Sequence, residues 1–367
     1  MLRPTTPISL LPAELLIDVL GRLDTRSVRS CITVCRGWQA VLRRSPSLAQ
    51  RYRFPLKYCA YEDRRRLPQQ LDGEQRQGRL VTKACIRYSA SAFAVNPASK
   101  TMFRGTPGGD IIVSDASTGA FIMQWSAHSD FINELVVDAT GRLWSCSDDA
   151  TIKAWSSEGT QLAVCLEPLA CPVNCITVAE RFGVVFSGDA AGCVDAFDLE
   201  TGAHKLTVHE AHPEPIEAVA VTDIGFCSAS LDRTVKVFKH TGELVHTLRG
   251  HTRGVLTVVA SGEKIVSAGG DRAILVWNAA SGRCLFSLLG HHDAVFKLVL
   301  AGDRLFSGSS DATVKVWWCG QNDGQLVHTL TNHHETVAGL SFPKVPSSSN
   351  VSRHLWTLDD AGIVLRW

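Results

Sequence analysis

Short runs of alternating apolar and polar residues, each closed by an aromatic residue, recur along the C-terminal four-fifths of the chain. The phrase "SSDATVKVW" at 309–317 returns as "GGDRAILVW" at 269–277, "SLDRTVKVF" at 230–238 and "SDDATIKAW" at 147–155. Alternation over so few residues is typical of a β-strand. The closing aromatic residues lie 39 to 50 residues apart, at Trp155, Phe197, Phe238, Trp277, Trp317 and Trp367. We therefore expect repeated antiparallel units of about four strands each.

A histidine precedes the aspartate of several phrases by a constant distance. His212, His251 and His291 stand 20 residues before Asp232, Asp271 and Asp311. A single four-stranded unit leaves both faces of its sheet apolar, so the units must pack on one another, and a closed ring also protects the strand edges.

Counting the repeated phrases gives seven units, of which the first and the last are irregular. In the first, Ser114 takes the position of the closing aromatic residue. The chain ends on the closing Trp367 of the last unit, so we expect its missing fourth strand to come from "GRLVTKACI" at 78–86. The Pro/Ser-rich stretch at 343–353 predicts a surface loop.

These landmarks resemble the WD-repeat family over residues 79–367. The resemblance implies an all-β, seven-bladed propeller whose ring is closed by an N-terminal strand. It also implies that the His, a Ser or Thr, the Asp and the Trp of each regular blade form one buried chain of hydrogen bonds. For two blades this gives His251, Ser267, Asp271 and Trp277, and His291, Ser307, Asp311 and Trp317. Phe197 and Phe238 have no indole donor and Ala191 replaces an aspartate, so we expect those blades to be locally weaker.

The N-terminal region, residues 8–54, has a helical rather than a strand pattern. Apolar residues recur at helical spacing, and Pro12 and Glu14 suit the first turn of a helix. A helical segment of about 45 residues cannot bury this much apolar surface within itself. Its helices therefore either pack on the repeat domain or dock a partner.

The motif "LPAELLIDVLGRLDTRSVRSCITVCRGW" resembles an F-box. The residues that match are Leu11, Pro12, Leu15, Leu16, Val19, Leu20, Leu23, Val34, Cys35 and Trp38. The resemblance implies docking on a Skp-type adaptor through these residues, with Leu11, Pro12 and Leu15 in contact, and through it on a cullin–RING ubiquitin ligase. We expect a small α-helical F-box at 8–54, a polar linker at 55–78 and the propeller at 79–367.

Charge is distributed unevenly between these parts. Residues 1–80 carry 15 Lys and Arg against 7 Asp and Glu, a net charge of +8, whereas the remainder carries −7. A basic segment is compatible with nucleic-acid binding, but its scattered arginines and the lack of a binding motif favour solvated helices.

Location and cysteine chemistry follow from the apolar runs. No run of 18 apolar residues predicts a membrane span, and Pro12, Glu14 and Asp18 interrupt the first apolar stretch, which argues against a signal peptide. Most of the 12 cysteines lie in apolar runs, as free core thiols of an intracellular protein would, in cytoplasm or nucleus. Cys171 and Cys175 have poor metal-ligand spacing, and we expect neither a metal nor a cofactor.

We expect no catalysis by this chain. It contains no phosphate-binding loop, zinc-protease motif or nucleophile elbow. The resemblance implies a substrate receptor of a ubiquitin ligase, and the main alternative is a WD scaffold acting outside protein degradation.

Arg233 and Arg272 directly follow equivalent aspartates, and with Arg253 they suit a phosphorylated or otherwise anionic degron, although such turns are also common on solvated surfaces. Asp148, Leu231 and Ser310 occupy equivalent turn positions and are expected to line the same mouth of the ring.

Overall fold

The computed structural model describes residues 79–82, 92–156, 159–165, 169–320, 324–342, 355–360 and 363–367. The chain divides into two units, Met1–Glu74 and Gln75–Trp367. The described residues all belong to the second unit. The predicted helical segment at 8–54 and the linker at 55–78 lie outside them.

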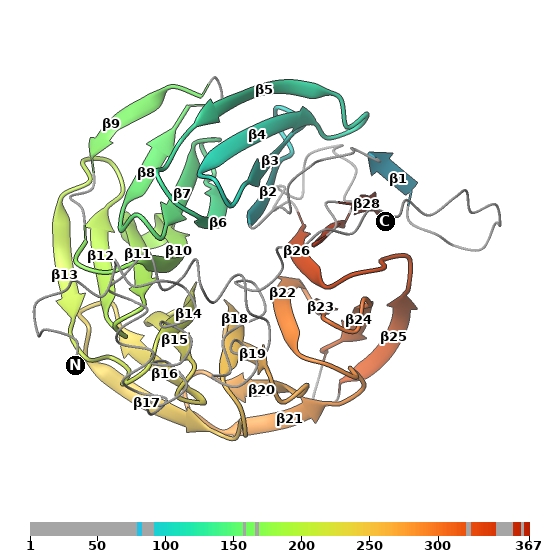
Figure 1. Ribbon diagram of the computed structural model, residues 1–367. Coiled ribbons are helices and arrows are strands. Elements are labelled where there is room, and N and C mark those ends of the chain that lie inside the picture. The colour runs from blue at the N-terminus through green and yellow to red at the C-terminus, as the bar shows by residue number, and fades with distance from the viewer. Residues whose placement is uncertain are drawn as a thin grey trace, which may run out of the picture. The chain divides into compact units, whose positions relative to one another are not determined.

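Seven four-stranded antiparallel sheets form the second unit, and they are arranged in a ring like the blades of a propeller (Figure 1). Blade 1 contains β2 (Ala92–Asn96), β3 (Thr101–Gly105), β4 (Asp110–Asp115) and β5 (Phe121–Ser126). Blade 2 contains β6 (Ile132–Val137), β7 (Leu143–Ser147), β8 (Ile152–Trp155) and β9 (Gln161–Cys165). Blade 3 contains β10 (Val173–Ala179), the 3₁₀ turn η3 (Glu180–Phe182), β11 (Val184–Asp189), β12 (Val194–Asp198) and β13 (His204–Val208).

The remaining blades repeat this order from the centre of the ring outwards. Blade 4 contains β14 (Ile216–Val221), β15 (Gly225–Ser230), β16 (Thr234–Lys239) and β17 (Leu244–Arg249). Blade 5 contains β18 (Val255–Ser261), β19 (Lys264–Gly269), β20 (Ile274–Asn278) and β21 (Cys284–Leu288). Blade 6 contains β22 (Val295–Ala301), β23 (Arg304–Ser309), β24 (Val314–Trp318) and β25 (Gln325–Leu330). Blade 7 contains β26 (Val337–Ser341), β27 (Trp356–Asp359), β28 (Val364–Arg366) and β1 (Arg79–Thr82). The seven-bladed all-β prediction is confirmed.

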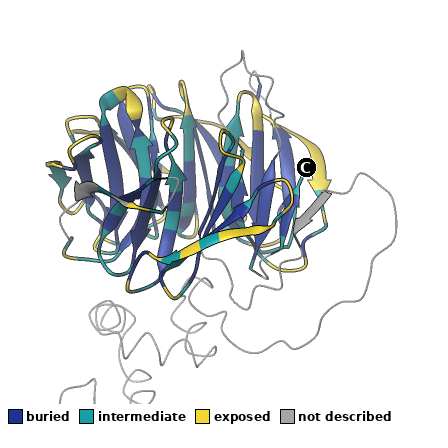
Figure 2. Ribbon diagram, turned by 90° about the horizontal axis from the view of Figure 1, so that it is seen from above, coloured by how far each residue is buried: buried dark blue, intermediate teal, exposed yellow. Residues whose placement is uncertain are grey.

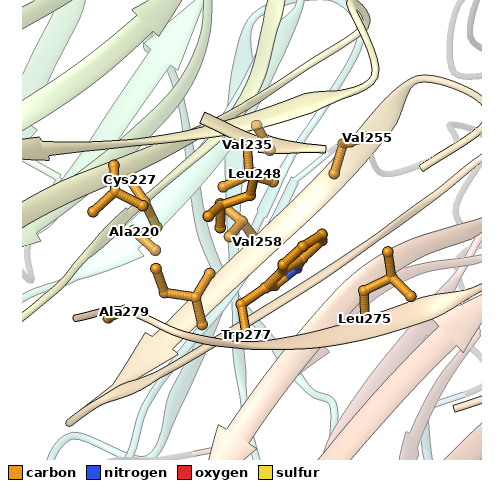
Figure 3. Packing of buried hydrophobic residues seen from close by; sticks show 12 residues of the cluster. Ala220, Cys227, Val235, Leu248, Val255, Val258, Leu275, Trp277 and Ala279 are labelled. Atoms are coloured by element: carbon orange, nitrogen blue, oxygen red, sulfur yellow. The ribbon is translucent and has the colours of Figure 1, made fainter. Parts of the chain in front are cut away.

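Apolar cores lie between neighbouring blades rather than within any one blade. Between blades 4 and 5, Val235 and Leu248 pack with Val255, Val258 and Trp277 (Figure 3). The second and third strands are therefore buried on both faces, whereas exposed residues collect on outer strands and turns (Figure 2). Each blade therefore depends on its neighbours to bury both of its faces.

The ring is closed by the segment that precedes the first blade. β1 runs antiparallel to β28, with Arg79 opposite Arg366 and Leu80 opposite Leu365. This pairing confirms that 78–86 supplies the fourth strand of the last blade.

Glu134 of β6 links blade 2 to two other blades. Its Oε1 lies 3.1 Å from Lys297 Nζ of β22 in blade 6. Its Oε2 accepts a hydrogen bond from the Ile176 amide of blade 3.

The two predicted hydrogen-bond tetrads are confirmed. In blade 6, Trp317 Nε1 donates to Ser307 Oγ at 2.8 Å, and Ser307 Oγ lies 2.7 Å from His291 Nε2. His291 Nδ1 lies 2.8 Å from Asp311. Blade 5 repeats the arrangement in His251, Ser267, Asp271 and Trp277. The indole can only donate and the hydroxyl does both, so a neutral imidazole in this chain carries its proton on Nδ1 and donates it to the aspartate.

Sequence reasoning missed two further tetrads. One lies in blade 2 and consists of His128, Ser145, Asp149 and Trp155. There the histidine precedes the aspartate by 21 residues instead of 20. His333, Thr357, Asp359 and Trp367 complete another in blade 7. There the loop insertion separates histidine from hydroxyl, and the aspartate stands two positions earlier than in other blades. The motif "NHHETV", similar to "GHHDAV", was the available signal.

Blades 3 and 4 depart from the pattern in different degrees. Blade 4 keeps His212, Ser228 and Asp232 but has Phe238 in place of the indole. In blade 3, Leu169 occupies the histidine position, since its amide bonds Ala150 O as the His128 amide bonds Gly109 O. Phe197 stands at the tryptophan position and Ala191 at the aspartate position. The buried Ser187 Oγ therefore has no hydrogen-bond partner.

Blade 1 replaces the tetrad with an arginine. Ser114 stands opposite Met102 as Trp155 stands opposite Leu143, which confirms its predicted position. Arg104, at the hydroxyl position and only 3% exposed, donates from Nη2 to Ser114 Oγ at 3.2 Å. Burial lowers the pKa of Arg104 to about 10. The long side chain therefore occupies space that an indole ring fills in regular blades.

The contrast between Ser307 and Ser187 gives a matched test of the tetrads. Ser307→Ala leaves the Trp317 N–H and His291 Nε2 without their partner, and we expect it to lower the free energy of unfolding by about 1–3 kcal/mol. Ser187→Ala removes a buried hydroxyl that bonds nothing, so it should be neutral or slightly stabilising. Urea denaturation of both variants measures the difference. Equal losses would show that the hydrogen-bond chain contributes nothing beyond packing.

The closure strand gives a second prediction. Deleting Arg79–Thr82 removes the ladder to β28 and exposes the edge of blade 7, which we expect to cost about 2–5 kcal/mol in lost hydrogen bonds. The thermal midpoint should then fall by roughly 5 °C or more. Deleting the four linker residues 69–72 serves as a control of equal length. The closure idea fails if the two deletions melt alike.

Candidate functional site

The tetrad histidines and aspartates lie at one end of the ring, which we call the upper face. The loops before the first strand of each blade carry the histidines, and the turns between second and third strands carry the aspartates. Because neighbouring strands of a blade are antiparallel, these two sets of connections meet at the same end. The other connections form the lower face.

The upper-face turns fix the backbone of the predicted arginines. Arg233 and Arg272 have φ of 74° and 70°, in the left-handed region that glycine favours. At the same turn position, blades 1 and 3 carry Gly109 and Gly192, with φ of 87° and 83°. Blades 4 and 5 thus keep an arginine at a position where the backbone favours glycine.

The three predicted arginines occupy one part of the upper face. Arg253 lies beside the blade 5 turn, because a Cβ at Gly270 would be 3.4 Å from Arg253 Cβ. The neighbouring Gly254 packs on the blade 4 turn, where a Cβ would be 2.8 Å from Leu231 Cδ2. Arg253 is therefore next to both turns, the one with Arg233 and the one with Arg272. All three side chains are exposed, and within the described residues none forms a side-chain hydrogen bond or ion pair.

Asp148, Leu231 and Ser310 occupy equivalent turn positions, as expected. Their amides donate to Phe131 O, Pro215 O and Ala294 O in the same way. All three are half-buried. Asp148 is held in place, since Asn133 Nδ2 donates to it at 2.8 Å and also to Val173 O of the next blade. Asp148 is therefore part of the packing between blades 2 and 3, and its role in lining the mouth stays a prediction.

The electrostatics of the upper face differ from blade to blade, which sequence reasoning did not resolve. Burial, followed by the charges of Asp359 and Glu335, raises the pKa of Asp360 in blade 7 to about 6. In blade 6, burial favours the neutral form of Asp311, but hydrogen bonds from His291 and Thr313 outweigh it and hold the pKa of that carboxyl below its ordinary value. The three upper-face arginines without an acidic partner, Arg233, Arg253 and Arg272, lie in blades 4 and 5.

Other chemistry has little support in the described part of the chain. Cys175 is buried in the core and its thiol lies 3.7 Å from Gly188 O, while burial raises the pKa of the half-buried Cys171. In the part of the chain that the structure describes, no group of three or more His, Cys, Asp or Glu residues is suited to hold a metal ion. Those same residues contain no helix of the length and apolarity that crossing a bilayer requires.

Comparison with known proteins finds family models that match the N-terminal segment and part of the propeller. The F-box-like family model matches residues 8–55. The WD domain, G-beta repeat model matches 119–156, 242–278 and 282–317. The three matches end just after Trp155, just after Trp277 and at Trp317. Each covers the fourth strand of one blade and the first three strands of the next, whose tetrad is complete.

Individual relatives add the fold but no activity. The chain is 23% identical over 172 residues to the periodic tryptophan protein 2 homolog of Caenorhabditis elegans, covering 46% of this chain and 19% of that protein. It thus spans about a fifth of the length of this relative. The crystal structure of the computationally designed Ika8 protein superposes with a TM-score of 0.61 at 21% identity, covering 79% of this chain and 99% of that one. The family models and the seven blades together identify the chain as an F-box/WD-repeat protein.

Proposed function

We propose that this chain is the substrate-recognition subunit of a Skp–cullin–RING ubiquitin ligase. The observation that carries the proposal is an F-box-like segment at 8–55 followed in the same chain by a complete WD propeller. The F-box docks the Skp-type adaptor, and the upper face of the propeller binds a protein degron. The F-box contacts rest on the sequence, because residues 8–54 lie outside those that the structure describes.

The receptor makes and breaks no bond itself. Its contribution is to hold a substrate lysine close to activated ubiquitin, which raises the effective concentration of one reactant beside the other. The tetrad histidines and aspartates support this view, because their ring nitrogens and carboxylates are engaged in bracing the blades. Imidazole held on both sides in this way is not free to act as a general base.

The degron is anionic and binds at Arg233, Arg253 and Arg272. Guanidinium groups present forked donors that match the geometry of a phosphate or carboxylate. These three are exposed and unpaired with any acid in the described residues, and Arg253 lies next to both turns that carry the other two. Some other arginines of the propeller are paired with acids, as in the Arg181–Asp223 and Arg142–Glu200 ion pairs. Leu231 belongs to the same turn as Arg233, and Asp148 and Ser310, at the equivalent positions of blades 2 and 6, line the same mouth of the ring.

The adaptor contact is tested by combining Leu11→Ala, Pro12→Ala and Leu15→Ala. Each large apolar side chain buried at an interface contributes roughly 1.5–3 kcal/mol, so the triple variant should bind a purified Skp-type adaptor at least ~100-fold more weakly. A pull-down followed by calorimetry measures the loss. Changing the linker residues Gln69, Gln70 and Gln75 to alanine is the matched control and should leave binding intact. No binding by the intact chain would point instead to a WD scaffold that acts outside degradation.

The degron surface is tested by Arg233→Glu combined with Arg272→Glu. We expect this variant to lose phosphopeptides that the intact chain captures from a degenerate phosphoserine and phosphothreonine peptide library, with an affinity loss of at least ~10-fold from reversed charges. Arg181→Glu with Arg283→Glu changes the net charge equally on the lower face and should retain capture. Binding of the same peptides by both double variants, or without phosphate, would rule the anionic site out.

A further inference from the structure

One threonine lies among the three arginines of the upper face. Thr252 is exposed, and its hydroxyl forms no hydrogen bond among the described residues. Its backbone amide donates to Asp271 Oδ2 at 2.9 Å, which fixes it beside the blade 5 turn that carries Arg272. Arg253 follows it directly in the chain, and the glycine after that packs against the blade 4 turn that carries Arg233. Thr252 is therefore next to the segments that carry all three arginines.

The equivalent residues of the other described loops lack this combination. Before blades 2, 3, 4, 6 and 7, the residue that follows the tetrad histidine position is Ser129, Ala170, Pro213, His292 and His334. Ser129 has the only other hydroxyl of this set, and its amide bonds Asp149 Oδ2 at 3.0 Å in the same way. Asp130 follows it where Arg253 follows Thr252. Ser129 is thus a matched position with acidic rather than basic neighbours.

A phosphate ester suits the Thr252 hydroxyl. It carries about −1.5 to −2 charges at neutral pH and three acceptor oxygens, and guanidinium groups offer forked donors of matching geometry. The Asp271 carboxylate opposes a second negative group, but it is bonded to His251 Nδ1 at 2.9 Å and is outnumbered by the three arginines. At Ser129 the same group would meet two carboxylates instead. A phosphate is therefore attracted at one position and repelled at the other.

We propose that Thr252 is a phosphorylation site whose phosphate occupies the surface formed by Arg233, Arg253 and Arg272. A protein kinase transfers the γ-phosphoryl group of ATP: the Thr252 oxygen bonds to phosphorus, the bond from that phosphorus to the leaving oxygen of ADP breaks, and the hydroxyl proton passes to a base of the kinase. Arg249, three residues earlier, is exposed and gives the segment "RGHTR" a basic flank that suits an arginine-directed kinase. As a means of regulation the inference rests on the proposed function, because the phosphate takes the place of an anionic degron.

The first experiment treats the full chain with ATP and the catalytic subunit of cyclic-AMP-dependent protein kinase, an arginine-directed enzyme. Mass spectrometry after digestion should find phosphate on Thr252 and none on Ser129, and Thr252→Val should remove it. A peptide of residues 246–257 serves as the unfolded comparison. Phosphorylation of that peptide without phosphorylation of the folded chain would show that the loop does not admit a kinase, and the modification site would fall.

Phosphorus NMR tests whether the arginines hold the phosphate. Phosphoserine is installed during translation at position 252 in one full-length chain and at position 129 in another, which needs no kinase. Nearby cations favour the doubly charged phosphate, so its second pKa, ordinarily about 6, should lie at least ~0.5 lower at position 252 than at 129. Arg233→Gln combined with Arg272→Gln should abolish most of that difference. Equal values at the two positions would overturn the pairing.

Competition is measured with the phosphopeptides that the unmodified chain captures. Phosphoserine at position 252 should weaken their binding at least ~10-fold, whereas phosphoserine at position 129 should leave it within ~2-fold. Unchanged binding would overturn the regulatory role. A lowered phosphate pKa in a chain that captures no phosphopeptide would contradict the proposed degron surface and support the modification site. The two proposals can therefore fail separately.

Discussion

The structure depends on one constraint: a four-stranded blade cannot bury its own apolar faces. Each core lies between two blades, as Val235 and Leu248 of blade 4 pack on Trp277 of blade 5. Such a stack is stable only when its two ends meet, because otherwise the first and last blades each expose an apolar face. β1 makes that meeting possible by adding Arg79–Thr82 to the last sheet. The N-terminal residues of the propeller unit and its C-terminal strand therefore share one sheet.

The tetrads act within this frame as a second level of order. They join the loop before a blade to its central strands through buried polar groups, and such groups must be fully paired to be stable. In blades 2, 5, 6 and 7 the tetrad is complete, and its side chains are joined by hydrogen bonds. Blade 3 retains only Ser187 from the set, and its hydroxyl is orphaned. The ring tolerates this because packing on both neighbours supports each blade.

Blade 4, which has Phe238 in place of the tetrad indole, also carries features that distinguish this propeller from a regular one. Blade 4 has arginine at a positive-φ turn on its upper face and an outward His240 on its lower face. The first leaves an unpaired cation beside Arg253, and the second stacks the His240 ring on Phe182. Both occur in connections, where side chains are not fixed by the packing of sheets. The regular strands hold these connections in place, and differences between the turns distinguish the candidate site on the upper face.

The sequence by itself determined the number of blades, the F-box-like motif and two of the four complete tetrads, because these are written as periodic landmarks such as His291 and Asp311. It also placed Ser114 and the closing strand, because a missing element in a periodic ring must be supplied from elsewhere. Tertiary structure alone decided that Asp359 replaces the usual aspartate and that Leu169 stands at a histidine position. It alone decided that Glu134 meets Lys297 of a distant blade and that His240 turns outwards. These features depend on the relative positions of neighbouring or opposite blades, which no local pattern of residues encodes.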